Sequence, residues 1–358
     1  MKTHAAIAFS ADAPLEIREV ELAEPGAGEV RVKMQACGIC RSDLSALEGK
    51  ETVEFPVVLG HEGAGIVDAV GSGVTRLGAG DRVVLSWTPA CGVCAGCRRG
   101  EVHLCERVSM TMGSQGPMSL DGRSLDRFMG LGAFSEHVVV PEAMAIPVAS
   151  ALGPEHTCLI GCGVSTGFGA AVNTAAVRWG ERVAVFGCGG VGLAAIQGAK
   201  VAGAATIIAI DPIAERREAA QRLGATLALA PDGAVKKIVR ETGGGVDVAI
   251  ECVGKPATMV DAFNVIRSGG RCIVVGLPAF TETLELPAIM LLREKSIKGS
   301  IYGSVSPATD FQKIATLGDN GVLQLTALVD STRPFSEINE GFAAMREGRL
   351  TRVVLIFP

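Results

Sequence analysis

The chain has 358 residues, of which 48% are hydrophobic and 20% are charged, and its formal net charge at pH 7 is −5. This length exceeds the size at which one hydrophobic core usually stops growing, so two domains are expected. The acidic balance argues against a nucleic-acid partner, which would require a basic patch.

The N-terminal stretch holds an apolar run of only five residues, Ala5–Phe9, which is too short for the core of a secretory signal. The uncharged segment Val183–Ile196 is short for a membrane span and is interrupted by glycines. We therefore expect a cytoplasmic protein with no membrane partner. In that reducing compartment disulfides rarely persist, so the eleven cysteines are better explained by metal ligation or burial.

The first 160 or so residues favour short β-strands broken by Gly and Pro, as in "VVLGHEGAGIVDAVGSGVTRLGAGDRVVL" at 57–85. Two short motifs lie in this part, "CGICRSD" at 37–43 and "GHEGAGIV" at 60–67. Neither is informative alone, because a cytosolic CxxC can be a redox pair and a single His is more often structural than a ligand. Spacing does not connect them with each other or with Cys162 in "LIGCGVSTGFG".

A dense cysteine cluster follows, with Cys91, Cys94 and Cys97 at intervals of three and Cys105 eight residues later. Tetrahedral zinc takes four ligands, and short Cys-x2-Cys turns bring thiolates onto one ion at about 2.3 Å. Because four cysteines leave no position open, the pattern predicts a closed structural zinc site. The alternatives are buried free thiols or a disulfide pair, and a zinc-ribbon nucleic-acid module fits poorly in an acidic chain.

The segment from Arg182, "RVAVFGCGGVGLAAIQGAKVAGAATIIAID", predicts a dinucleotide site. A β-type run, 183–186, is followed by a Gly-x-Gly-x-x-Gly motif, a helical stretch at 193–201 and a second strand at 206–210. The first glycine permits a tight turn, the second allows the backbone to approach the pyrophosphate, and the third allows close helix packing. The residues expected to contact the cofactor here are Gly187, Gly189, Gly190, Val191 and Gly192.

Asp211 follows the second strand, about twenty residues past the glycines, where a carboxylate bonds the adenosine ribose and repels a 2′-phosphate. NAD is therefore expected rather than NADP, with Arg216 as a further cofactor contact or as a solvated helix charge. Strands beginning at Val246 and Arg271 alternate with helical segments and extend a parallel sheet.

With these motifs in this order, the chain resembles the zinc-dependent alcohol dehydrogenases of the medium-chain dehydrogenase/reductase superfamily. The resemblance covers nearly all of the chain, from "GEVRVKMQACGICRSD" and "VVLGHEGAGIVDAVGSGV" to "PFSEINEGFAAMREGRLTRVVL", and includes the four-cysteine lobe. It is greatest for the branch that includes animal alcohol dehydrogenases, glutathione-dependent formaldehyde dehydrogenase and bacterial aryl-alcohol dehydrogenases.

The resemblance implies that a catalytic zinc is held by Cys40, His61 and Cys162, with an open fourth position, as catalytic zinc sites usually have. Asp43 would fix the ring of His61, and Glu62 would lie behind the metal. Two zinc ions per chain are then expected, one catalytic and one structural.

The resemblance also implies that Arg41 and Arg352 contact the cofactor pyrophosphate and that Trp87 lines the substrate pocket. Ser42 matches the hydroxyl that relays the released proton. Many relatives carry a His three residues later, but this chain has Ser45. A serine is a poor general base near neutral pH, so we expect turnover to fall more steeply at low pH than in relatives with the His.

The resemblance predicts reversible hydride transfer between a primary alcohol, with aromatic and allylic alcohols as candidates, and NAD to give the aldehyde. One alternative is a glutathione-dependent formaldehyde dehydrogenase, although the arginine that grips the glutathione carboxylate in those enzymes is replaced by Ser109. A zinc dehydrogenase acting on polyols or secondary alcohols usually diverges from "LIGCGVSTGFG". A non-catalytic NAD-binding protein would be expected to lack a ligand or the relay hydroxyl.

The predicted fold class is α/β, with a mainly-β GroES-like catalytic domain and a Rossmann coenzyme domain built on a doubly wound parallel sheet. The expected boundaries are 1–162 for the catalytic domain with its zinc lobe at about 91–105, 163–301 for the NAD-binding domain, and 302–358 for a return segment that completes the first domain. Relatives associate through the cofactor domain, so a homodimer is expected, with a tetramer as the alternative.

Overall fold

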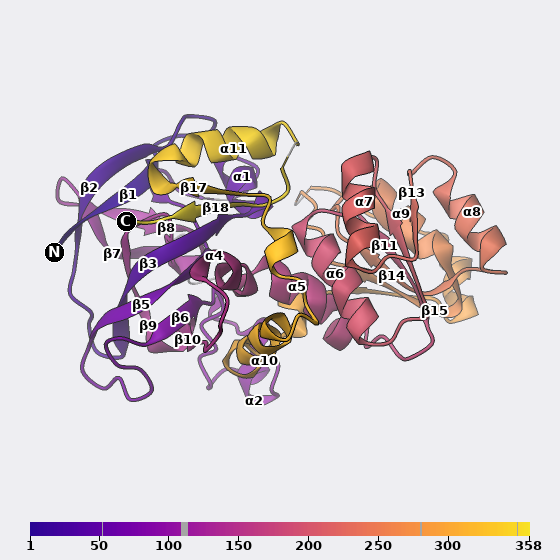
Figure 1. Cartoon of the computed structure of the whole chain (residues 1–358), viewed down its shortest axis with the longest axis horizontal. Coiled ribbons are helices and arrows are strands. Elements are labelled where there is room, and N and C mark those ends of the chain that lie inside the picture. The colour runs from indigo at the N-terminus through magenta and orange to yellow at the C-terminus, as the bar shows by residue number, and fades with distance from the viewer. Residues whose placement is uncertain (52, 109–113, 280, 349) are drawn as a thin grey trace. The chain divides into compact units, whose positions relative to one another are not determined.

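The computed structural model describes residues 1–51, 53–108, 114–279, 281–348 and 350–358 (Figure 1). The chain forms two compact units, Met1–Cys162 together with Ser306–Pro358, and Gly163–Val305. The return to the first unit thus begins at Ser306, four residues after the position expected from the sequence. Among the described residues, no helix has the length and apolar character needed to cross a membrane.

The first unit contains a closed barrel. Alternating buried residues along its strands, such as Val20 and Leu22, fill the interior. The strands of the barrel, in spatial order, are β1 (Lys2–Ala8), β2 (Glu16–Leu22), β7 (Ser114–Leu120), β8 (Arg123–Arg127) and β4 (Val57–Val58).

A second, seven-stranded sheet in the same unit carries the return segment. The last strand of the chain, β18 (Val353–Ile356), pairs antiparallel with β3 (Glu29–Ile39), with Val353 opposite Ile39 and Ile356 opposite Ala36. The C-terminal segment therefore lies beside the strand that leads to Cys40 (Figure 1, yellow beside indigo). In spatial order the strands are β10 (Ala145–Pro147), β6 (Arg82–Leu85), β5 (Glu62–Val70), β3 (Glu29–Ile39), β18 (Val353–Ile356) and β17 (Ser331–Pro334), with β9 (His137–Pro141) also paired to β3.

Short helices connect these strands, and two longer ones come from the return segment. Pro at the first turn of α10 and Pro at the first turn of α4 favour a helix start, because that position needs no N–H donor. The helical segments are α1 (Arg41–Leu47), α2 (Ala95–Arg98), η1 (Val102–Leu104), η2 (Phe128–Gly130), η3 (Glu142–Met144), α4 (Pro154–Thr157), η4 (Cys158–Gly161), α10 (Pro307–Asp319), η8 (Thr326–Leu328), η9 (Phe335–Glu337) and α11 (Ile338–Arg346).

The second unit is built on a six-stranded parallel sheet. The strand order reverses between β11 (Arg182–Phe186) and β14 (Val246–Glu251). This point is the topological switch at which dinucleotides bind in such sheets. Every residue of β14 is buried, as expected for a central parallel strand covered on both faces. The order is β13 (Leu227–Leu229), β12 (Thr206–Ile210), β11 (Arg182–Phe186), β14 (Val246–Glu251), β15 (Ile266–Val274) and β16 (Ser296–Gly299).

The helices of this unit alternate with its strands, so the predicted Rossmann fold with a doubly wound sheet is confirmed. Apolar residues such as Phe186, Ile208 and Phe263 form a core between the sheet and the helices. The helical segments are α5 (Gly163–Gly169), the π-helix η5 (Ala170–Thr174), α6 (Gly190–Val201), α7 (Ala214–Leu223), α8 (Ala234–Glu241), α9 (Pro256–Val265), η6 (Ala288–Arg293) and η7 (Tyr302–Ser304).

Candidate metal and cofactor sites

The first candidate site is organised by a buried carboxylate on helix α1. Cys40 is the N-cap of this helix, and Asp43 reaches back to accept the Cys40 N–H at 2.9 Å. The other oxygen of Asp43 accepts the Gly60 N–H at 3.0 Å and lies 3.1 Å from Nδ1 of His61. The carboxylate therefore fixes both the helix start and the imidazole ring, as the second shell of a metal site commonly does.

The structure brings four possible ligand residues together at this point. The ligand atoms of Cys40, His61, Glu62 and Cys162 all lie within 4.8 Å of one another. Two thiolates on one tetrahedral zinc would be about 3.8 Å apart, so this spacing is suitable for a metal ion. Nε2 of His61 is buried and, among the described residues, has no hydrogen-bond partner. A buried polar atom of this kind needs a partner, and zinc fits the nitrogen and sulfur donors around it.

The ionisable groups of this cluster lie close enough to shift one another's pKa. A hydrogen bond from Cys162 lowers the pKa of the Cys40 thiol well below its usual value, while the same bond raises the pKa of Cys162. Burial raises the pKa of Glu62 to about 7, although the guanidinium of Arg352 acts in the opposite direction. Nη1 of Arg352 donates to Glu62 at 2.9 Å, and the Arg352 side chain is only 5% exposed. A cation at this point would stabilise both thiolates.

Ser42 and Phe128 each lie against a residue of the cluster. The hydroxyl of Ser42 lies 3.9 Å from Sγ of Cys40, and Ser45 is three residues further along the same helix, hence on the same face. Trp87 is 7% exposed. The Phe128 ring packs edge-on against the His61 imidazole, with 5.6 Å between the ring centroids. The sequence analysis missed Phe128, since no motif or spacing distinguishes it from an ordinary core residue.

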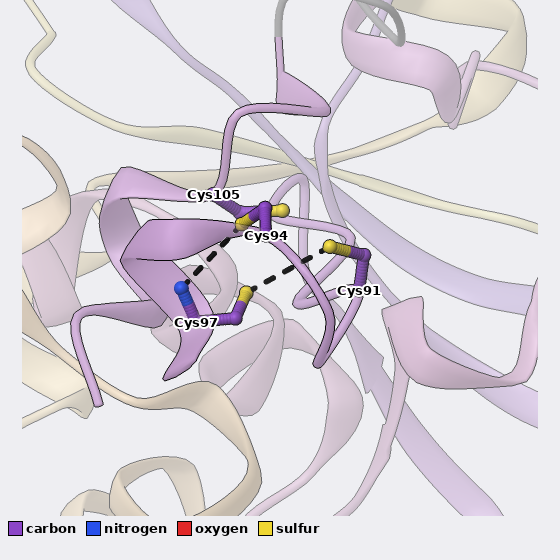
Figure 2. Close-up of side chains that lie close together, drawn as sticks. All are labelled: Cys91, Cys94, Cys97 and Cys105. Atoms are coloured by element: carbon purple, nitrogen blue, oxygen red, sulfur yellow. Dashed lines mark hydrogen bonds between the residues drawn. The ribbon is translucent and has the colours of Figure 1, made fainter. Parts of the chain in front are cut away.

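The second cluster is the lobe predicted from the cysteine spacing (Figure 2). The sulfur atoms of Cys91, Cys94, Cys97 and Cys105 lie within 4.8 Å of one another, with 4.0 Å between those of Cys91 and Cys97. Hydrogen bonds from backbone amides, first that of Val93, lower the pKa of Cys91 to about 6, whereas burial raises the pKa of Cys97 to about 12. A divalent cation would offset the cost of ionising the buried thiol, so these donors suit a closed zinc site.

The remaining cysteines lie outside both clusters and are free thiols. Cys37 is fully buried despite its CxxC spacing with Cys40, and burial raises the pKa of its thiol well above the usual value. The others in this group are Cys158, Cys188, Cys252 and Cys272.

The glycine loop after β11 has the geometry that the sequence predicts. Gly187 has φ +87°, a conformation that favours glycine. A Cβ on Gly192 would lie 1.8 Å from the Gly187 carbonyl oxygen, so only glycine allows this close packing. A Cβ on Gly189, in contrast, would meet no protein atom within 4 Å. The loop is therefore open at Gly189, the N-cap of α6, where the positive end of the helix dipole suits a phosphate.

Asp211 lies at the end of β12 and is 3% exposed. Its two carboxylate oxygens accept the Cys188 N–H at 2.8 Å and the Ile213 N–H at 2.9 Å. The carboxylate thus fixes the glycine loop, and its remaining lone pairs are the ones that a ribose would use. Arg216 is half-buried, and Arg41, in the other unit, is exposed.

Comparisons with known proteins show the family to which the chain belongs. Residues 26–150 match the family described as alcohol dehydrogenase GroES-like domain, and residues 190–319 match zinc-binding dehydrogenase. The S-(hydroxymethyl)glutathione dehydrogenase of Synechocystis sp. is 39% identical over 99% of this chain and 100% of that protein. The class-3 alcohol dehydrogenase of Myxine glutinosa is 39% identical over 98% of this chain and 96% of that protein.

Solved structures are similar over the whole chain. The benzyl alcohol dehydrogenase of Acinetobacter calcoaceticus has a TM-score of 0.95 and 32% identity, covering 100% of both chains. The alcohol dehydrogenase zinc-binding domain protein of Burkholderia ambifaria has a TM-score of 0.96 and 35% identity, covering 100% of this chain and 99% of that chain.

The fold and the sites define a two-domain zinc-binding dehydrogenase, an oxidoreductase whose cofactors are NAD and zinc. The chain belongs to the zinc-dependent alcohol dehydrogenase family of the medium-chain dehydrogenase/reductase superfamily, so the resemblance noted in the sequence is confirmed.

Proposed function

We propose that the enzyme transfers hydride reversibly between a primary alcohol and NAD to give the aldehyde. The observation that carries this proposal is the set of Cys40, His61 and Cys162, with Nε2 of His61 left for a metal and the neighbouring Glu62 carboxylate already paired with Arg352. A structural site would use a fourth protein donor, whereas three nitrogen and sulfur ligands keep a position for substrate. A non-catalytic NAD-binding protein has no need of such a set.

The chain's own residues hold and orient the reacting groups. Cys40, His61 and Cys162 would hold the catalytic zinc, with Asp43 fixing the imidazole and Glu62 behind it. The four lobe cysteines would hold a second, structural zinc. When bound, zinc supplies a Lewis acid that favours the ionised alcohol, and NAD supplies the hydride acceptor.

The proton path begins at Ser42, which lies against Cys40 and would accept the alcohol proton while passing its own proton outward. Ser45, on the same helix face, stands where many relatives have a His. Without a side chain that titrates near neutrality, we expect turnover to fall steeply at low pH. Ser45→His should flatten the pH profile of kcat, and an unchanged profile would contradict this path.

The substrate proposed is a free alcohol with an aromatic or allylic group. Phe128 places an aromatic ring against His61 of the metal cluster, the family resemblance assigns Trp87 to the pocket wall, and a solved relative with 32% identity is a benzyl alcohol dehydrogenase. The second candidate is the glutathione adduct of formaldehyde, because a curated relative with 39% identity is an S-(hydroxymethyl)glutathione dehydrogenase. Ser109, on which the sequence argument against this substrate depends, lies outside the described residues.

For the cofactor we propose that the pyrophosphate lies at Gly187–Gly192, with Arg41 and Arg352 as its cationic contacts, and that Asp211 and Arg216 contact the adenosine ribose. The open face at Gly189 supports the phosphate position. In the structure the guanidinium of Arg352 is paired with Glu62 of the metal cluster.

The assembly proposed is a homodimer formed through the cofactor domain, with a tetramer as the alternative. Among the described strands, β16 pairs only with β15, so its other edge is open. Apolar side chains close to it in the sequence are exposed, including Leu292 at 81% and Ile289 at 65%. Analytical ultracentrifugation should show a dimer that Leu292→Glu dissociates.

We also propose a cytoplasmic location, which is supported by the finding that none of the eleven cysteines forms a disulfide. The chain is expected to act in a reducing compartment.

The decisive test of the activity is NADH formation from NAD with aliphatic, allylic and benzylic alcohols, and with formaldehyde plus glutathione, before and after chelator treatment. Chelator-sensitive activity that is highest with benzylic or allylic alcohols would support the proposal. Activity only with formaldehyde and glutathione together would establish the second candidate instead. Inactivity of protein loaded with zinc and shown to bind NADH would contradict both.

A further inference from the structure

A buried carboxylate lies at the switch point of the Rossmann sheet and has no role in the sites described above. Glu251 is the last residue of β14, is fully buried, and is paired in register with Phe186, the last residue of β11. The glycine loop leaves β11 at the next residue, so this carboxylate lies beside the crevice where dinucleotides bind in such sheets.

The two oxygens of Glu251 are used unequally. Oε1 accepts three hydrogen bonds, from the N–H of Val253 at 2.9 Å, the N–H of Gly254 at 2.9 Å and the hydroxyl of Thr258 at 2.7 Å. Oε2 is buried and, within the described part of the chain, has no hydrogen-bond partner. Burying an unpaired carboxylate oxygen is unfavourable, so the hydrogen bonds to Oε1 must offset the free-energy cost of leaving Oε2 unpaired.

The two backbone amides that donate to Oε1 belong to the turn between β14 and α9. A methyl carbon of Val253 lies 2.8 Å from the position that a Cβ on Gly187 would take, so this side chain packs against the first glycine of the loop. Gly254 has φ +82°, and a Cβ there would lie 2.4 Å from the Leu277 carbonyl oxygen. The turn is therefore packed tightly between the glycine loop and the segment at Leu277.

The same turn presents apolar surface to its surroundings. Val253 is 41% exposed and Leu277 is 61% exposed, although Val253 packs against Gly187 of the glycine loop and Leu277 packs against Gly254. Apolar side chains in that position are suited to cover a flat ring or a sugar of a bound dinucleotide.

We propose that Glu251 is a positioning residue for NAD: by accepting three hydrogen bonds on one oxygen, it fixes the turn at Val253 as an apolar wall beside the glycine loop. The inference uses the NAD site of the family and does not depend on which alcohol is the substrate, so it can fail without affecting the proposed reaction. What matters in this arrangement is the acceptor atom at Oε1.

The same strand provides a matched control. Asp247, near the amino end of β14, is 8% exposed and also accepts strong bonds, from the Arg182 N–H at 2.7 Å and from Nε of Arg267 at 2.7 Å. Its loss should destabilise the same sheet, but at the end opposite the crevice. A general loss of stability and a specific loss of NADH binding can therefore be separated.

The test is the dissociation constant of NADH, measured by fluorescence titration of the zinc-loaded protein without alcohol, together with the thermal midpoint. Glu251→Ala should weaken NADH binding about tenfold, and Glu251→Gln, which keeps an acceptor oxygen, should stay within about twofold. Asp247→Ala should lower the thermal midpoint and leave the NADH affinity unchanged. In turnover, Glu251→Ala should raise the KM for NAD and leave kcat at saturating NAD near that of the native enzyme.

Equal NADH affinities in Glu251→Ala and Asp247→Ala would overturn the proposal, and so would a Glu251→Gln variant as impaired as Glu251→Ala. If Glu251→Ala does not fold, Thr258→Val carries the test, because it keeps the side-chain volume and removes the hydroxyl that lies 2.7 Å from Oε1 and 2.8 Å from the Lys255 carbonyl oxygen. It should weaken NADH binding about threefold. An unchanged affinity in that variant would also overturn the proposal.

Discussion

Gly60 precedes the predicted zinc ligand His61, and its replacement tests how the metal site is held. Gly60 has φ +93°, and a Cβ there would lie 2.5 Å from the Phe134 backbone nitrogen and 2.7 Å from its ring. The ring cannot move aside easily, because Phe134 is fully buried and packs edge-on against Phe342 with centroids 5.9 Å apart. The added methyl group must therefore displace backbone.

The cost of Gly60→Ala can be worked out in two parts. The left-handed conformation costs a non-glycine residue about 1–2 kcal/mol. Overpacking against a rigid neighbour adds about 1–3 kcal/mol, which gives about 2–5 kcal/mol in all. Gly73 is the matched control, since its φ is +78° but a Cβ there would meet nothing within 4 Å. Gly73→Ala should therefore cost only the first part.

The assay is urea denaturation of both variants, with the zinc content of the folded proteins measured in parallel. The Gly60 N–H donates to Asp43, which also holds His61, so a displaced backbone should reduce zinc below two ions per chain in Gly60→Ala alone. Equal stability and equal zinc content in the two alanine variants would refute the reasoning.

Three other outcomes follow from the sites and ion pairs. Cys97→Ser should lower the zinc content by one ion per chain and destabilise the lobe, as measured by metal analysis and thermal unfolding, because a closed site needs all four thiolates. Burial acts to raise the pKa of Glu181, but hydrogen bonding from Arg271 holds that pKa below its usual value. The ion pair therefore stabilises the fold above about pH 4, and this stabilisation is lost as the pH falls through the lowered pKa. Glu181→Gln should then cost about 1–2 kcal/mol at pH 7, and the difference should shrink in urea titrations at lower pH. For the buried pair, Glu62→Gln and Arg352→Met should each lower the free energy of unfolding by about 3–5 kcal/mol, and the double variant should lose much less than the sum of the two. Additive losses in urea denaturation would contradict a direct interaction between the two side chains.

Local sequence patterns predicted the parts of the fold that depend on near neighbours. The strand expected at 206–210 is β12, and the Gly-x-Gly-x-x-Gly turn has the backbone conformation that its glycines allow. The lobe cysteines, too, come together within a short loop, so their spacing was informative. In each case the interacting residues are close in the sequence, so local spacing is enough to predict their contact.

Contacts between distant residues could not be derived in this way. Cys40, His61 and Cys162 were connected only by resemblance to a family, because three separate segments of the first unit supply them. The position of Phe128 against His61, and the three bonds to Glu251, depend on how side chains pack after the sheets have formed. A buried Phe or Glu gives no periodic signal that separates a site residue from a core residue.

The chain returns to its first unit after completing the Rossmann fold, and this return completes the metal site. Strand β18 pairs with β3, so the backbone bonds of the strand leading to Cys40 are completed by the last residues of the protein. Arg352, one residue before β18, then donates to Glu62 and lies within 3.5 Å of the Ile39 carbonyl oxygen. Without that guanidinium the buried Glu62 would either keep an uncompensated charge beside two thiolates or take up a proton, and both are unfavourable. The return segment is therefore part of the metal site, which is built from residues near both ends of the chain.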